Sequence, residues 1–200
     1  MKTRDNAPEL LLQGRIDSDK KFLKGIPLAS NLGIGGNTFR AFRNAGARPS
    51  EIYRGWAQSD GFKIVQERKV RAREQFLDLH RALSDSFSDY WKEHATRSLY
   101  IHEKYKVVDL FIKALSYSTG HPSEEKRENL YWHANIPLDQ FSLLAIKRMF
   151  LGVVLSKNPR MGDIEDEETY QFIQDSIYRF TKSWNIPNLV FDHLAWNMEH

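Results

Sequence analysis

The sequence predicts an all-α protein, and three observations support this prediction. Apolar residues recur every three or four positions over most of the 200 residues, which is the spacing of the buried face of a helix. One stretch, residues 66–94, contains neither proline nor glycine and is long enough for many helical turns. No stretch alternates apolar and polar residues in the manner of a half-buried strand. We also find no internal repeat and no low-complexity segment.

In the first half of the chain we expect three helices. A short helix covers residues 37–45 and is closed by Gly46, and a second covers residues 50–57. The third runs from residue 66 to 94, because its apolar residues at positions 76, 79, 83, 87 and 90 share one side of a helix. A glycine-rich loop, residues 29–36, precedes the first of these helices.

The second half of the chain has the pattern of four more helices. One covers residues 105–119, where a glycine and a proline end it, and a linker over residues 121–138 follows. The next helix begins after Asp139. Another follows the acidic residues 165–168, which suit the positive end of a helix dipole. The last helix runs from residue 188 to the C-terminus.

The charge is divided unevenly along the chain. Residues 1–74 hold 15 Lys and Arg against 8 Asp and Glu, whereas residues 75–200 hold 14 against 18. A basic segment suits a phosphate backbone, although such an excess is also common on solvated helices. We expect a single domain over residues 1–200, built as a helical bundle of two lobes with a cleft. The basic lobe covers about residues 1–74 and the catalytic lobe about residues 95–200.

The composition excludes several kinds of chemistry. The chain contains no cysteine, which excludes disulfides, thiol nucleophiles, iron–sulfur clusters and zinc held by cysteine. His102 and His133 have no partner at a metal-binding spacing, so we expect no metal and no cofactor. The polar start of the chain and the lack of a long apolar run predict a protein of the cytoplasm that does not enter a membrane.

The segment Asn135-Ile136-Pro137-Leu138-Asp139 is the most informative motif. Proline keeps the residue before it out of helical space, so Asp139 falls at or beside the N-cap of the next helix. There its carboxylate can accept hydrogen bonds from the amides of Phe141 or Ser142. A capping role alone would explain this aspartate.

A lysine helix stands upstream of this motif. Lys106 opens an apolar stretch that contains a second lysine, Lys113, and Asp139 follows Lys106 after 33 positions. This pair resembles the helix-hairpin-helix DNA glycosylase superfamily, and within it the archaeal 8-oxoguanine glycosylase branch, over about residues 100–155. The turn before the lysine, residues 98–103, lacks the glycines usual in that superfamily.

The resemblance implies a helix-hairpin-helix glycosylase fold and roles for two residues. Lys106 would be the nucleophile that attacks the sugar, and Asp139 would be the carboxylate that assists it. Such an enzyme flips a damaged or modified base out of double-stranded DNA and cleaves its glycosidic bond, here with an AP-lyase step through a lysine Schiff base. Lys104 lies two positions from Lys106 and is an alternative nucleophile.

Further residues are candidates for the base pocket and for DNA contacts. Flipped bases stack on flat side chains, and the aromatic residues that flank Asp139 are Trp132, Tyr131 and Phe141. The glycines of the early loop, Gly33, Gly35 and Gly36, can offer amides to a phosphate, or form a plain flexible loop. Candidate phosphate contacts at the start of the long helix are Lys63, Arg68, Lys69, Arg71 and Arg73.

The sequence supports two hypotheses about the function. The first is a monomeric DNA glycosylase that acts on 8-oxoguanine in repair or on a hypermodified base in defence against foreign DNA. The alternative is a helical DNA-binding or interaction protein without catalysis, in which Asp139 is only a cap and Lys106, Asp109 and Lys113 form a solvated face. The two differ in whether Lys106 and Asp139 share one cleft.

Overall fold

The computed structural model describes residues 7–28, 32–42, 45–46, 48–150, 153 and 155–199. Within these residues the protein is mostly helical, which confirms the predicted all-α class. The helices are α1 (Ala7–Lys24), α2 (Pro49–Trp56), α3 (Phe62–Glu67), α4 (Arg73–His94), α5 (Ile101–Tyr117), α6 (Glu124–His133), α7 (Gln140–Met149), α8 (Glu167–Ser183) and α9 (Val190–Glu199). Short 3₁₀ helices cover Thr38–Ala41 and Met161–Asp163, and a π-helical turn covers Ala57–Gly61.

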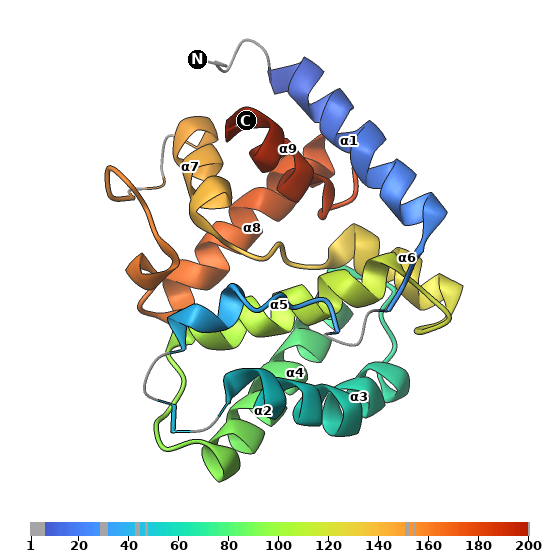
Figure 1. Ribbon diagram of the computed structural model, residues 1–200. Coiled ribbons are helices and arrows are strands. Elements are labelled where there is room, and N and C mark those ends of the chain that lie inside the picture. The colour runs from blue at the N-terminus through green and yellow to red at the C-terminus, as the bar shows by residue number, and fades with distance from the viewer. Residues whose placement is uncertain are drawn as a thin grey trace.

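Helix α5 lies at the centre of the molecule between two groups of helices (Figure 1). Helices α2, α3 and α4 pack on one side of it, where Phe111 of α5 meets Trp56 and Phe62 edge-on at ring distances of 5.3 and 5.5 Å. Helices α1, α7, α8 and α9 lie on the other side. The core is therefore continuous through α5.

The two groups do not follow the expected division into residues 1–74 and 95–200. Helix α1 packs along α9, so the first helix belongs with the C-terminal group. Gly14 permits this contact, since a Cβ there would lie 3.0 Å from the backbone nitrogen of Leu194. Charge along the sequence therefore does not indicate which helices share a core.

The long helix expected over residues 66–94 is interrupted. Helix α3 ends at Glu67, and α4 begins only at Arg73. The break is stable because Val70 is buried, and because the amine of Lys126 donates hydrogen bonds to the carbonyls of Val65 and Gln66 at the end of α3. The partner that caps α3 comes from a distant helix, so the local pattern could not show the break.

Other boundaries also differ from the predictions. Helix α5 begins at Ile101 rather than near residue 105, and the expected linker 121–138 contains helix α6, whose N-cap is Ser123. The helix expected over 37–45 forms one 3₁₀ turn within the described residues. The described part also contains strand pairing that we did not expect, a parallel pair of β1 (Ile26–Pro27) and β2 (Ser118–Thr119).

Candidate active site

Asp139 caps helix α7 as predicted. Its carboxylate Oδ1 accepts a hydrogen bond from the amide of Ser142 at 2.9 Å, and the hydroxyl of Ser142 accepts one from the amide of Asp139 at 2.7 Å. This reciprocal arrangement is a capping box, which fixes the side chain of the aspartate at the start of the helix. Oδ2 of Asp139 accepts no hydrogen bond from the described residues. One carboxylate oxygen thus serves the fold, and the other is available for chemistry.

The extended segment before Asp139, residues 134–138, is held by side chains from other helices. Gln174 of α8 binds both backbone groups of Ile136, at 3.1 Å to its amide and 2.8 Å to its carbonyl. Asn188 donates to the carbonyl of Ala134 at 2.6 Å. Because this segment is buried and lies outside any sheet or helix, these bonds satisfy backbone groups that would otherwise be desolvated without partners. They also fix where Asp139 lies.

Lys106 reaches the same segment from helix α5. Its Nζ donates a hydrogen bond to the carbonyl of Leu138, the neighbour of Asp139, at 2.7 Å. Burial lowers the pKa of Lys106, whereas the negative charges of Asp139 and Asp192 act to raise it. The amine therefore lies against the backbone next to Asp139, where the charge of the carboxylate acts on it.

The alternative nucleophile, Lys104, lies elsewhere. Its Nζ sits over the ring of its neighbour Tyr105 at 4.4 Å. Two residues correspond to about 200° around a helix, so side chains at 104 and 106 point to nearly opposite sides of α5. Lys106 is the lysine directed at the Asp139 segment.

A cavity of about 390 Å³ lies beside Asp139. Lys106 does not line it directly, since the amine is held against the backbone next to Asp139. The residues that line it come from α1, α5, α7 and α9: Lys21, Lys113, Asp139, Phe141, Ser142, Asp192, His193, Ala195 and Trp196. Lys113 and Asp192 form an ion pair at 2.5 Å that joins α5 to α9 across this cavity.

The polar face of α5 is not a solvated face. Asp109 is fully buried, and its carboxylate binds His80 Nε2 at 2.9 Å and accepts hydrogen bonds from the hydroxyl of Tyr170 at 2.8 and 3.0 Å. Burial raises the pKa of Asp109, and its hydrogen bonds to His80 oppose this. With Lys106 and Lys113 also engaged, this face forms one wall of the site.

Only one of the three aromatic candidates for the base pocket lines the cavity. Phe141 does so, and its ring meets Trp196 edge-on at 5.4 Å. Trp196 is 54% exposed and was missed at the sequence level, where nothing distinguished it from the core aromatics. The two rings offer flat apolar surface next to Asp139.

The other two aromatic candidates lie elsewhere. Tyr131 is buried, stacks on Phe22 at 4.5 Å, and donates a hydrogen bond to the hydroxyl of Ser18, so it belongs to the core. Trp132 is half-buried outside the cavity, and its carbonyl accepts a hydrogen bond from the amide of Asn188. Tyr131 and Trp132 are close to Asp139 in sequence but do not line the cavity beside it, because helix α6 directs their side chains away from the extended segment.

Arg73 is a structural residue and not a phosphate contact. It is 6% exposed, donates a hydrogen bond to the carbonyl of His133 at 2.6 Å, and lies over the ring of Tyr178. Burial lowers its pKa, and the charge of Asp175 counteracts this. Arg73 thereby ties the start of α4 to the end of α6.

The remaining basic candidates are exposed but lie away from the cavity. Arg71 pairs with Glu125 at 3.3 Å, and Lys63, Arg68 and Lys69 extend from α3 and the turn after it. Helix α3 packs on the side of α5 opposite to α7 and α9 (Figure 1). These residues and Asp139 therefore lie on different sides of α5.

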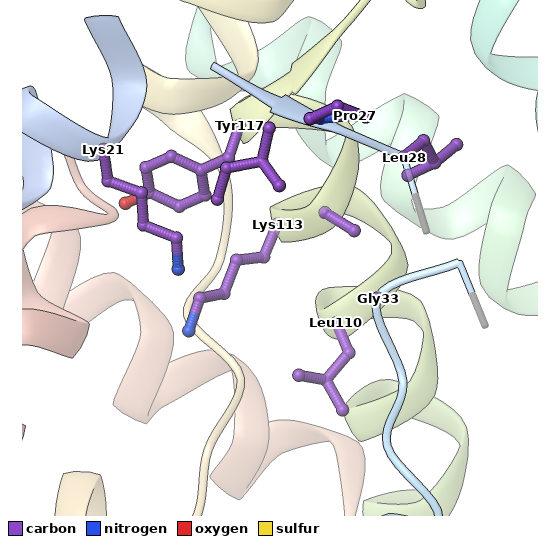
Figure 2. A pocket seen from close by; sticks show the side chains of 9 residues that line it. Lys21, Pro27, Leu28, Gly33, Leu110, Lys113 and Tyr117 are labelled. Carbon is purple, nitrogen blue, oxygen red and sulfur yellow. The ribbon is translucent and has the colours of Figure 1, made fainter. Parts of the chain in front are cut away.

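Gly33 of the glycine-rich loop packs against α5. It has a φ of +86°, and a Cβ on it would lie 2.2 Å from the Cβ of Ala114, so this position requires glycine. It lines a second cavity, of about 240 Å³, next to Lys113 (Figure 2). A Cβ on Gly35 or Gly36 would meet nothing within 4 Å. Residues 29–31 of this loop lie outside the described residues.

The turn between α4 and α5 contains no glycine and is held by side chains. Arg97 and Glu103 form two hydrogen bonds, at 2.6 and 2.8 Å, and Glu103 also accepts one from the amide of Tyr100. The charged pair and the cap fix the entry into α5, and with it the position of Lys106 one and a half turns later.

No protein family, no curated protein and no solved structure that we compared matches this chain. In the described part of the chain, no helix is long and apolar enough to cross a membrane. No group of three His, Asp or Glu side chains suited to a metal ion occurs there either.

Proposed function

We propose that this protein is a DNA glycosylase that uses Lys106 and Asp139 to remove a base from double-stranded DNA. The observation that carries the proposal is the hydrogen bond from Lys106 to Leu138, because it brings a lysine from one helix to the backbone beside an aspartate 33 residues later. The cavity next to them has room and aromatic surface for a flipped base.

The chemistry requires both residues. A neutral lysine amine attacks the sugar C1′, the glycosidic bond breaks, and the base leaves with its bonding electrons and the proton that the amine gives up. The carboxylate of Asp139 accepts that proton and passes it on, and its charge stabilises the positive sugar in the transition state. Burial favours the neutral amine by lowering the pKa of Lys106.

A lyase step follows from the covalent intermediate. The sugar ring opens, and the lysine adduct becomes a protonated Schiff base. Removal of a proton from C2′ then breaks the bond between C3′ and its phosphate oxygen, which cleaves the strand by β-elimination. Hydrolysis of the Schiff base returns the lysine.

Two substitutions test the proposal. Lys106→Gln and Asp139→Asn should each reduce base release at least 100-fold, which is the lower range for loss of a catalytic proton acceptor or nucleophile. Asparagine can still accept the hydrogen bond from Ser142, so the cap of α7 is retained. Lys104→Gln is the matched control and should leave the rate unchanged. Full base release by both site variants would overturn the assignment of Lys106 and Asp139, whereas no release by the wild-type protein would favour the DNA-binding protein without catalysis.

The substrate is identified with a panel of duplexes. Each contains one base that is oxidised, alkylated or a hypermodified cytosine, and release of the free base is measured. Release of 8-oxoguanine favours a repair enzyme, and release of a hypermodified cytosine favours defence against foreign DNA. Borohydride trapping of a protein–DNA adduct tests the lyase step, and normal base release without trapping indicates a glycosylase that lacks it.

A further inference from the structure

Lys21 of α1 lies where the two cavities of the site meet. The cavity beside Asp139 and the smaller cavity beside Gly33 share two lining residues, Lys21 and Lys113. Figure 2 shows both side chains extending into the same open space, with Leu110 and Gly33 facing it from the other side. The two cavities thus adjoin at these two amines.

The two amines have different surroundings. Lys113 is paired with Asp192, whereas Lys21 forms no ion pair with any described residue. The amine of Lys21 lies over the ring of Tyr117 at 4.7 Å and is half-buried. Burial and the neighbouring charge of Lys113 lower the pKa of Lys21, and the charge of Asp192 opposes this. The carboxylate of Asp192 is paired with Lys113, so two neighbouring ammonium groups share one counter-charge.

The wall that carries Lys21 is held by the core. The hydroxyls of Tyr117 and Ser18 are hydrogen-bonded at 2.8 Å, and Tyr131 donates to the same serine at 2.7 Å. Ser18 lies one helical turn before Lys21 on α1. The ring beneath the amine is therefore fixed, which limits where the amine can lie.

The smaller cavity provides a mainly apolar slot next to this amine. Its wall on α5 consists of Leu110, Ala114 and the ring of Tyr117, and Pro27 and Leu28 lie opposite. Gly33 packs directly against Ala114, since a Cβ on it would lie 2.2 Å from the Cβ of Ala114, so the open space lies beside this contact and not between the two residues. The space next to the amine suits a small substituent with a charged or strongly accepting group.

We propose that the flipped base lies in the cavity beside Asp139 and that Lys21, which lines this cavity and the smaller one, binds an ionised or strongly electronegative group on the edge of that base. This proposal rests on the proposed glycosylase function and names the class of its substrate. The ring of the base lies against Phe141 and Trp196, and its substituted edge faces the amine of Lys21. A charge-assisted hydrogen bond in such a site is stronger than a neutral one.

The test uses two duplexes that differ in one substituent. One contains a single 5-carboxylcytosine and the other a single 5-methylcytosine, and binding is measured with Lys106→Gln protein, which retains the duplex uncleaved. We expect about tenfold tighter binding of the carboxyl duplex, which corresponds to about 1.4 kcal/mol. Lys21→Met in the same background should remove this preference.

Lys24→Met is the matched control. Lys24 is exposed at the end of the same helix, so its substitution removes one positive charge without altering either cavity. Each variant loses one positive charge and therefore a similar general attraction to the phosphate backbone. A difference between the two variants in their preference for the carboxyl duplex then indicates a local contact of Lys21. Lys21→Arg keeps the charge and should retain the preference, and circular dichroism melting verifies that all variants are folded.

Failure of this proposal differs from failure of the proposed function. Equal binding of the two duplexes by the Lys106→Gln protein, or a preference that survives Lys21→Met in folded protein, overturns the role of Lys21. Base release is measured separately with protein that retains Lys106. A preference that depends on Lys21, without release from any duplex of the panel, supports the subsite and overturns the glycosylase.

Discussion

Lys106 is subject to two opposing electrostatic effects. Burial favours its neutral amine, whereas Asp139, Asp192 and Asp109 favour the ammonium ion. Burial is the larger effect, so the pKa of Lys106 lies below the ordinary value of 10.5. The carboxylates around the amine, among them the proposed proton acceptor Asp139, thus limit how far the pKa of Lys106 can fall.

This balance predicts the pH dependence of adduct formation. Only the neutral amine attacks, so trapping should increase as the pH rises through the lowered pKa of Lys106 and level off above it. Asp192→Asn removes a charge that raises this pKa and leaves the charge of Lys113 uncompensated. Both effects lower the pKa, so the rise in trapping should move to lower pH.

The measurement is the rate of borohydride trapping against pH for the wild-type protein and the variant. Asp78→Asn is the control, since Asp78 is exposed on α4 and pairs with Arg81. A rise that stays in place in Asp192→Asn, or moves to higher pH, contradicts the assignment of Lys106 as the titrating group.

Among the elements, the extended segment 134–138 has the most specific function. The segment has no regular secondary structure, yet it is buried. It positions Asp139, which follows it directly, and the carbonyl of Leu138, which accepts the hydrogen bond from Lys106. Its geometry depends on Gln174, which acts on Ile136 as a neighbouring strand would. The precision of the site therefore comes from α8, which contributes no residue to the cavity beside Asp139.

Gln174→Leu should destabilise the protein and impair the site together. It leaves the amide and carbonyl of Ile136 buried without partners, which costs roughly 2–4 kcal/mol for the two groups. Urea denaturation measures this loss. Base release under conditions where the variant is folded should also fall, because Asp139 is less well positioned. Gln171→Leu, one turn earlier on α8 and half-buried, should change neither by much; equal effects of both variants would contradict the role of Gln174.

The sequence predicts the elements whose signals are local. The cap at Asp139 followed from the proline before it and the apolar spacing after it, and the structure has the expected hydrogen bond to Ser142. The break before α4 depends on Lys126, and the burial of Arg73 depends on Asp175 and Tyr178. These partners lie more than 50 residues away in the chain, so no local pattern contains them.

The same limit applies to the site. Lys106 and Asp139 were singled out because the segments around them resemble those of a glycosylase family, in which the two residues stand at or before the start of a helix. Lys21, Asp192 and Trp196 were missed as site residues because their role arises only when α1 and α9 pack together next to α5. Tyr131 and Trp132 were misplaced because closeness to Asp139 in sequence was taken for closeness in space.

For the molecule as a whole, the basic residues of α3 and the site lie on different sides of α5. Charges act across such a distance mainly through the long-range field, which salt screens within about 8–10 Å. Lys63, Arg68 and Lys69 should therefore speed the approach of DNA more than they hold it.

Replacement of these three residues by glutamine tests this expectation. The association rate should fall several-fold at 20 mM salt, while the dissociation rate remains nearly unchanged, as roughly expected for steering. The dependence of affinity on salt concentration distinguishes steering from direct binding of phosphates. A decrease in the salt slope of about 2–3 units, close to one per lost phosphate contact, would show that these residues bind the duplex directly.

The hydrogen bond from Lys106 to Leu138 also has a stereochemical consequence. A neutral amine has two N–H bonds and one lone pair in a tetrahedral arrangement, and the carbonyl of Leu138 occupies one N–H direction at 2.7 Å. The bond to Cε occupies a second direction, so the lone pair has only two positions while this hydrogen bond persists. In the proposed reaction the sugar must come to one of these positions, and the backbone carbonyl thereby restricts the direction from which C1′ can approach the amine.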